Sequence, residues 1–108
     1  MKNIDVNTVP LIPLTGIGYE IHRFSERPRP LIIGGVTIPH ALGLDGHSDA
    51  DVLCHAIADA ILGAVGAQDI GYWFPPSDQD IKGISSLKIL GKAVSIVKER
   101  GGRLANVD

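Results

Sequence analysis

Two stretches of this chain, residues 48–66 and 85–102, carry apolar residues at every third or fourth position and end at glycines. That spacing is typical of amphipathic helices, and a glycine often follows the last helical residue. Ser48 precedes Asp51 by three residues, as in a capping box, so we expect the first helix to begin there and to pack on a sheet. The buried stripe of the second helix is predicted to contain Leu87, Leu90, Val94 and Val97.

The remaining order in the sequence is typical of β-structure. Ile17, Tyr19 and Ile21 alternate with less apolar residues, which predicts a half-buried strand. Residues 31–33 and 36–38 are apolar and flank Gly34-Gly35, which predicts a hairpin. We therefore expect an α+β fold, a mixed β-sheet with helices packed on one face. A chain of 108 residues supports one domain, and residues 1–15 are expected to be an irregular extension.

Composition excludes several classes of protein. A formal net charge of -2 does not indicate a nucleic-acid-binding surface. No stretch has the length of a transmembrane helix, so we expect no membrane partner. The single cysteine, Cys54, cannot form an internal disulfide, which favours a reducing compartment such as the cytoplasm. His55 adjoins Cys54 but adjacent helical residues do not face each other, so a thiol nucleophile is rejected.

Three side chains could hold one divalent metal. Glu20 and His22 lie two apart on a predicted strand and so share a face. His55 lies on the predicted helix between Asp51 and Asp59, one turn from each, and a carboxylate beside a ligating histidine fixes its tautomer. The alternatives are an exposed polar strand face for Glu20 and His22, and helix capping for the acidic residues. Capping does not explain His55.

Two further segments could contact a substrate. His47 precedes the first helix, whose free N–H groups could attract phosphate, although a histidine there is more often a loop residue. The predicted loop 68–83 contains Trp73 and Phe74. Its aromatic residues either anchor it to the core or help it to cover a site.

Six motifs occur in a fixed order along the chain: G-x-G-Y-E-x-H-R-F (16–24), I-I-G-G-V-x-I-P (32–39), H-S-D-x-D (47–51), H-A-x-x-D-A-x-L-G (55–63), D-I-G (69–71) and F-P-x-x-D (74–78). With these motifs the chain resembles the 2-C-methyl-D-erythritol 2,4-cyclodiphosphate synthases of the non-mevalonate isoprenoid pathway. The resemblance covers residues 16–108.

The resemblance implies a metal-dependent phosphorus–oxygen lyase. Members of the family cyclise 4-diphosphocytidyl-2-C-methyl-D-erythritol 2-phosphate to 2-C-methyl-D-erythritol 2,4-cyclodiphosphate and release CMP. The substrate's own 2-phosphate attacks the β-phosphorus, so no protein nucleophile is needed. The family also implies a homotrimer with active sites between subunits, located in the cytoplasm or the plastid stroma.

Residue roles follow from the matching motif positions. Zinc would be bound by Glu20, His22 and His55, and His47 would stabilise charge in the transition state. Magnesium or manganese would occupy a second site mostly outside this chain. The implied substrate contacts are Glu20, His22, His47, Ser48, Asp69, Ile70, Gly71, Phe74, Pro75, Pro76, Ser77 and Asp78.

The chain departs from the family pattern at three points. Glu20 replaces the usual aspartate, which lengthens the ligand by one methylene, and Pro76 stands where an aspartate is common. Residues 16–108 correspond to the N-terminal two-thirds of the family's domain, so its last strands and helix are expected to be missing. Two alternatives stay open: a metal-dependent phosphohydrolase, and a non-catalytic metal- or nucleotide-binding fragment.

Overall fold

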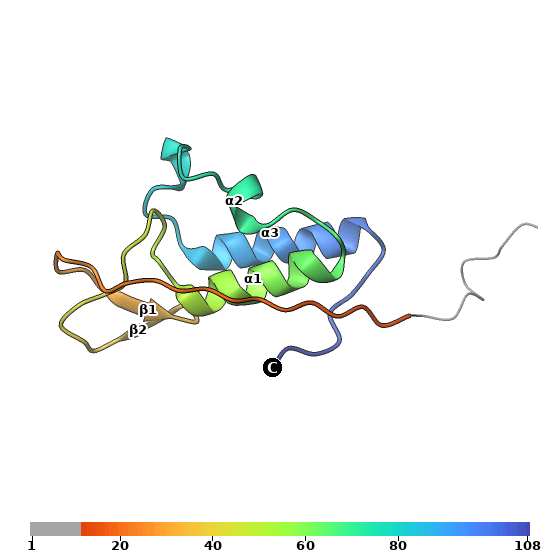
Figure 1. Ribbon diagram of the computed structural model, residues 1–108, viewed down its shortest axis with the longest axis horizontal. Coiled ribbons are helices and arrows are strands. Elements are labelled where there is room, and N and C mark those ends of the chain that lie inside the picture. Colours follow the sequence, from red (N-terminus) through yellow and green to blue (C-terminus); the bar gives the residue numbers. More distant parts are fainter. Residues whose placement is uncertain (1–11) are drawn as a thin grey trace, which may run out of the picture.

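The computed structural model describes residues 12–108, and Figure 1 shows how their elements are arranged. Of the predicted N-terminal extension, residues 1–11 lie outside the described part, and residues 12–15 form neither helix nor strand. The elements in chain order are β1 (Leu31–Ile33), β2 (Val36–Ile38), α1 (Val52–Ala64), α2 (Ile70–Trp73), the 3-10 helix η1 (Gln79–Ile81) and α3 (Ser86–Glu99).

The hairpin forms as predicted. β1 and β2 pair antiparallel, with Leu31 opposite Ile38 and Ile33 opposite Val36. Gly34 and Gly35 have φ angles of 63° and 78°. A two-residue turn with two positive φ angles matches the twist of the strands, and glycine adopts these angles without steric cost. The α+β class is confirmed, although the parallel pairing of a mixed sheet does not occur among residues 12–108.

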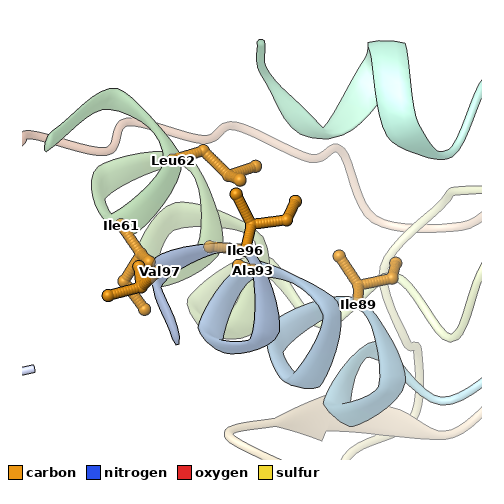
Figure 2. Close-up of a cluster of buried hydrophobic side chains, with 7 residues drawn as sticks. Ile61, Leu62, Ile89, Ala93, Ile96 and Val97 are labelled. Carbon is orange, nitrogen blue, oxygen red and sulfur yellow. The ribbon is translucent and has the colours of Figure 1, made fainter. Parts of the chain in front are cut away.

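The main core lies between α1 and α3, which run side by side (Figure 1). Ala58, Ile61 and Leu62 of α1 belong to one buried cluster with Ile89 and Ile96 of α3. Figure 2 shows Leu62 beside Ile96 and Ile61 beside Val97. Full burial of one such aliphatic side chain stabilises the fold by about 1.5–3 kcal/mol. The expectation that α1 packs on a sheet is wrong for this face, because α3 covers it.

The buried face of α3 agrees only in part with the predicted stripe: Val97 is buried and Leu90 and Val94 pack partly buried against the core. Leu87, predicted to be buried, is 51% exposed, whereas Ser86 is fully buried. Ile89 and Ala93 lie on the buried line instead. Apolar residues cover much of this helix, so spacing alone does not determine which side faces inward. Ser86 binds Asp49 through both its backbone N–H and its hydroxyl, and these bonds turn that side toward the core.

Asp51 joins the hairpin to α1. Its carboxylate is fully buried and accepts backbone hydrogen bonds from Cys54 (3.1 Å), Gly34 (2.9 Å) and Gly35 (2.6 Å). Asp51, and not Ser48, is therefore the N-cap of α1. Burial alone would raise the pKa of Asp51, but the three backbone hydrogen bonds outweigh it and hold the pKa below its usual value.

Residues 16–22, which precede the hairpin, alternate between two faces as predicted, but the apolar face points outward rather than toward the interior. Ile17, Tyr19 and Ile21 are 90%, 80% and 76% exposed. Gly16 and Gly18 instead lie against the backbone of α1. The segment runs extended along α1 (Figure 1) and forms no strand ladder within residues 12–108. The alternation correctly predicted which residues share a face. The face of Ile17, Tyr19 and Ile21 was wrongly expected to be buried; the glycine face lies inward instead, because only glycine can approach a helix backbone this closely.

The predicted loop 68–83 contains two short elements. Asp69 caps α2 by accepting from the N–H of Tyr72 at 3.1 Å, and Asp78 caps η1. Trp73 and Phe74 pack against the α1–α3 core, so they anchor this segment. No helix among residues 12–108 is long and apolar enough to cross a membrane.

Replacing Asp51 with alanine should strongly destabilise the protein, because three backbone N–H groups lose their acceptor. Unsatisfied buried donors cost about 1–3 kcal/mol each, partly relieved by water, so we expect a loss of about 2–5 kcal/mol in urea unfolding. Asp51→Asn should lose less, since its amide oxygen can still accept. Because the folded pKa is lowered, the advantage of Asp over Asn should be full above pH 3.8 and should fall as the pH drops below it. Glu99→Ala, at the exposed end of α3, is the control; equal unfolding midpoints for the two alanine variants would contradict this role.

Cys54 should resist thiol reagents while the protein is folded. The side chain is 2% exposed, and burial, followed by the neighbouring Asp51, raises the pKa of its thiol to about 12. The reactive thiolate is therefore almost absent at pH 8. We expect negligible labelling by a chromogenic disulfide reagent in buffer and complete labelling in urea. Fast labelling of the folded protein would show that this part of α1 opens readily.

Candidate functional site

The three proposed metal ligands lie together. Glu20 and His22 come from the extended segment, and His55 comes from the second turn of α1. One potential ligand atom from each lies within 4.8 Å of the others. The Glu20 Oε2 and His22 Nε2 atoms are 3.4 Å apart, and the rings of His22 and His55 meet edge to face at 5.1 Å between centroids.

These side chains fit a divalent metal. His22 Nδ1 is buried and has no hydrogen-bond partner among the described residues. A buried imidazole nitrogen without a partner is costly unless something binds it. Carboxylate oxygen and imidazole nitrogen both suit zinc, whose ligands at about 2.0–2.2 Å lie roughly 3.3–3.6 Å from each other in a tetrahedron. The candidate ligand atoms, which lie within 4.8 Å of one another, would therefore have to move only slightly closer together to bind one ion.

The protonation of this group is set by its surroundings. Burial, and then the hydrogen bond and charge of Asp59, raise the pKa of Glu20 to about 7. Burial, and then the neighbouring His22, lower the pKa of His55 below its usual range. His55 is therefore neutral at pH 7, which is the form that binds metals, whereas Glu20 holds its proton until about neutrality.

His55 is held from behind by a polar network. Its Nε2 lies 2.8 Å from Ser86 Oγ and 3.1 Å from Ser48 Oγ. Ser86 in turn donates its hydroxyl to Asp49. The expectation that Asp51 or Asp59 supports His55 on the α1 stripe is not met: Asp51 binds the hairpin, and Asp59 accepts from the N–H of Ile70 at 3.0 Å.

The three candidate ligands open into a cavity of about 370 Å³. Most residues that were predicted to contact substrate or metal line it, namely Glu20, His22, His47, Ser48, His55, Asp69, Ile70, Gly71, Phe74 and Pro76. Pro75, Ser77 and Asp78 are not part of its lining. Asp78 instead accepts from the N–H of Asp80 at 2.9 Å.

His47 and Ser48 differ in their environment. His47 is exposed at the cavity, whereas Ser48 is 5% exposed with its hydroxyl engaged in the network behind His55. Arg29 holds this turn by donating to the carbonyls of Gly46 (3.0 Å) and Ser48 (2.9 Å). At the helix end where free N–H groups were predicted to attract phosphate, the Asp51 carboxylate accepts from the N–H of Cys54. Phosphate binding beside His47 stays a prediction.

Part of this site was not predicted from the sequence. Asp45, Gly46, Asp59 and Ile89 also line the cavity. The sequence indicates only the helix position of Asp59, and it gives no sign of the polar contacts between Asp49 and Ser86. Asp59 could have been recognised from the sequence, since it lies one helical turn beyond His55. Nothing in the sequence points to Ser86, which is distant from His55 along the chain.

Comparison with known proteins places this geometry in a family. The YgbB family matches residues 14–108. The 2-C-methyl-D-erythritol 2,4-cyclodiphosphate synthase of Akkermansia muciniphila is 70% identical over 98 residues, which cover 91% of this chain and 58% of that protein. The enzyme of the same name from Synechococcus elongatus is 55% identical over 93 residues, covering 86% and 58%. This chain thus spans less than two thirds of the length of these curated relatives.

Solved structures agree with the sequence relatives. A structure of 2C-methyl-D-erythritol-2,4-cyclodiphosphate synthase superposes with a TM-score of 0.73 at 41% identity, over 81% of this chain and 57% of that one. A form of such an enzyme with CDP bound gives a TM-score of 0.72 at 41% identity over the same shares. Since the family match extends over nearly all described residues and the fold agrees, the chain belongs to the YgbB family.

Proposed function

We propose that this chain provides the metal-binding half of an enzyme site that makes 2-C-methyl-D-erythritol 2,4-cyclodiphosphate from 4-diphosphocytidyl-2-C-methyl-D-erythritol 2-phosphate, with release of CMP. The observation that carries the proposal is the convergence of Glu20, His22 and His55 at one wall of a cavity in a YgbB-family chain. The relatives that bear this activity in their names support the choice of reaction.

The charge of the cavity supports metal dependence. Glu20, Asp45, Asp59 and Asp69 line it, and no lysine or arginine does so among residues 12–108. A phosphorylated substrate would be repelled by these carboxylates. A bound divalent ion would neutralise that repulsion and polarise a phosphoryl oxygen.

The residues that line the cavity would have distinct roles in this reaction. Glu20, His22 and His55 would hold zinc, and His47 would donate to a phosphate oxygen from its exposed position at the cavity. The D-I-G segment (69–71) and Phe74 would position the erythritol phosphate part. The 2-phosphate oxygen forms the new bond to the β-phosphorus while the bond to CMP breaks, so catalysis consists mainly of positioning and charge stabilisation. The buried Cys54 takes no part.

The rest of the assembly is also proposed from the family. A magnesium or manganese ion at a second site, mostly outside this chain, would neutralise charge on the diphosphate, and a homotrimer would complete each site between subunits. The exposed apolar side chains of Ile17, Tyr19 and Ile21 fit a chain that is covered further in its assembled form, because monomeric proteins rarely expose such contiguous surface.

Zinc should bind one site per chain. In calorimetric titration at pH 8, we expect Glu20→Ala, His22→Ala and His55→Ala each to weaken binding by about 100-fold or more, since replacing even a residue that only supports a ligand costs about 10–100-fold. His40→Ala is the matched control, because His40 is exposed, stacks on Phe24 and does not line the cavity. Equal affinities for the three variants and the control would rule out this site.

Zinc affinity should also depend on pH in a defined direction. Glu20 must lose its proton to bind metal, and its pKa in the metal-free protein is raised to about 7. The apparent affinity should be nearly constant above pH 8 and should fall by about tenfold for each pH unit below 7 as the proton competes. Titrations between pH 5.5 and pH 8.5 at roughly constant ionic strength test this, and an affinity independent of pH would contradict the raised pKa.

The reaction can be tested in a chimera that joins residues 1–108 of this chain to the C-terminal part of the Akkermansia muciniphila relative. We expect it to release CMP and the cyclic diphosphate in equal amounts, measured by phosphorus NMR. The same chimera with His55→Ala should be slower by about 100-fold or more. Residues 1–108 alone should bind zinc but turn over far more slowly.

Different products would favour other functions. Release of inorganic phosphate without a cyclic product would identify a phosphohydrolase. Zinc binding with no turnover by the chimera, while the intact relative is active under the same conditions, would identify a non-catalytic binding unit.

A further inference from the structure

In the polar network next to His55, the donor and the acceptor of each hydrogen bond can be assigned. Asp49 accepts from the N–H of Ser86 (3.1 Å), from the N–H of Asp51 (3.2 Å) and from the hydroxyl of Ser86. A carboxylate accepts hydrogen bonds and has no hydrogen to donate in return. The single hydroxyl hydrogen of Ser86 is therefore committed to Asp49.

This commitment determines the tautomer of His55. Ser86 Oγ lies 2.8 Å from His55 Nε2 and has no second hydrogen to donate, so the imidazole must be the donor in that contact. Ser48 Oγ lies 3.1 Å from the same nitrogen and accepts from the N–H of Ala50 at 3.2 Å. Its own hydroxyl hydrogen is directed to Ser86 Oγ at 3.3 Å, because the Ser86 hydrogen is already donated to Asp49. Both hydroxyl oxygens thus fit a proton on Nε2, which leaves a lone pair on Nδ1 of the neutral ring.

We propose that Ser86 and Asp49 are positioning residues that hold His55 in its Nε2–H form and so make Nδ1 the atom that binds metal. This inference rests on the proposed function for its purpose, but the tautomer itself exists without metal. The contact also explains why a serine at the first position of α3 is fully buried. Through Ser86, the start of α3 would therefore control the orientation of His55, a candidate ligand on α1.

Neither residue needs to touch the ion or the substrate. Neither Ser86 nor Asp49 lines the cavity. Their effect passes through the His55 ring, as with the outer partners of ligating histidines in other metal sites, where loss typically lowers metal affinity about 10–100-fold.

The direct test is nitrogen-15 NMR of the imidazole groups in the metal-free protein at pH 8. We expect His55 to show a protonated Nε2 and a bare Nδ1. Ser86→Ala should weaken the hydrogen-bond shift of Nε2, because only the longer contact with Ser48 Oγ remains. Asp49→Asn should increase the Nδ1–H population, because the amide can donate to Ser86 Oγ and free the serine hydroxyl to donate to Nε2. Ser95→Ala is the control, since the Ser95 hydroxyl bonds only the Lys92 carbonyl in its own helix.

Zinc titration of the same proteins supplies the second readout. We expect Ser86→Ala and Asp49→Asn to weaken binding by about 10–100-fold and Ser95→Ala to leave it unchanged. A bare Nε2 in the wild-type protein would overturn the inference, and this result does not depend on whether any variant folds. Unchanged zinc affinity in Ser86→Ala, in a protein where His55→Ala abolishes binding, would also overturn it. Failure of the wild type to bind zinc would refute the proposed function, and the NMR result alone would then decide the inference.

Discussion

The candidate metal site depends on a close contact between two backbones. A Cβ atom added to Gly18 would lie 1.7 Å from the carbonyl oxygen of Ala56, and one added to Gly16 would lie 1.9 Å from that of Ala60. Only glycine allows the extended segment to lie this near to α1. Two and four residues after Gly18, Glu20 and His22 consequently face His55 at a separation that one ion can span.

Asp49 and Asp51, on either side of Ala50, hold the elements that surround this site. Asp49 binds the start of α3, and Asp51 binds the start of α1 and the hairpin turn. Between them, Ala50 adopts a φ of 58°, a conformation uncommon for a residue other than glycine, and the two carboxylates serve different elements. The same few residues that hold the elements together therefore also orient His55, so stability and metal binding should be linked in this protein.

Local signals in the sequence predicted the hairpin and both long helices. The meeting of Glu20 and His22 with His55 was predicted from their spacing together with the family motifs. Gly34-Gly35 and the helix-ending Gly66 and Gly101 act within a few residues of themselves, which is why they can be recognised in the sequence. What failed depended on contacts between distant segments. Periodicity shows which residues share a face but not what that face meets, so the outward side of residues 17–21 was assigned wrongly and Leu87 was wrongly included in the buried stripe of α3. Ser86 became a candidate only when its partners Asp49 and His55 were seen around it.

The most direct test of the account is anomalous diffraction at the zinc absorption edge from crystals of this chain grown with zinc. We expect a single strong peak per chain, bonded to the Glu20 carboxylate, a nitrogen of His22 and Nδ1 of His55, with Nε2 of His55 still facing Ser86. A strong peak elsewhere, with these three side chains unliganded, would contradict the metal site. A peak bonded to Nε2 of His55 would contradict the orientation derived from the Asp49–Ser86 network.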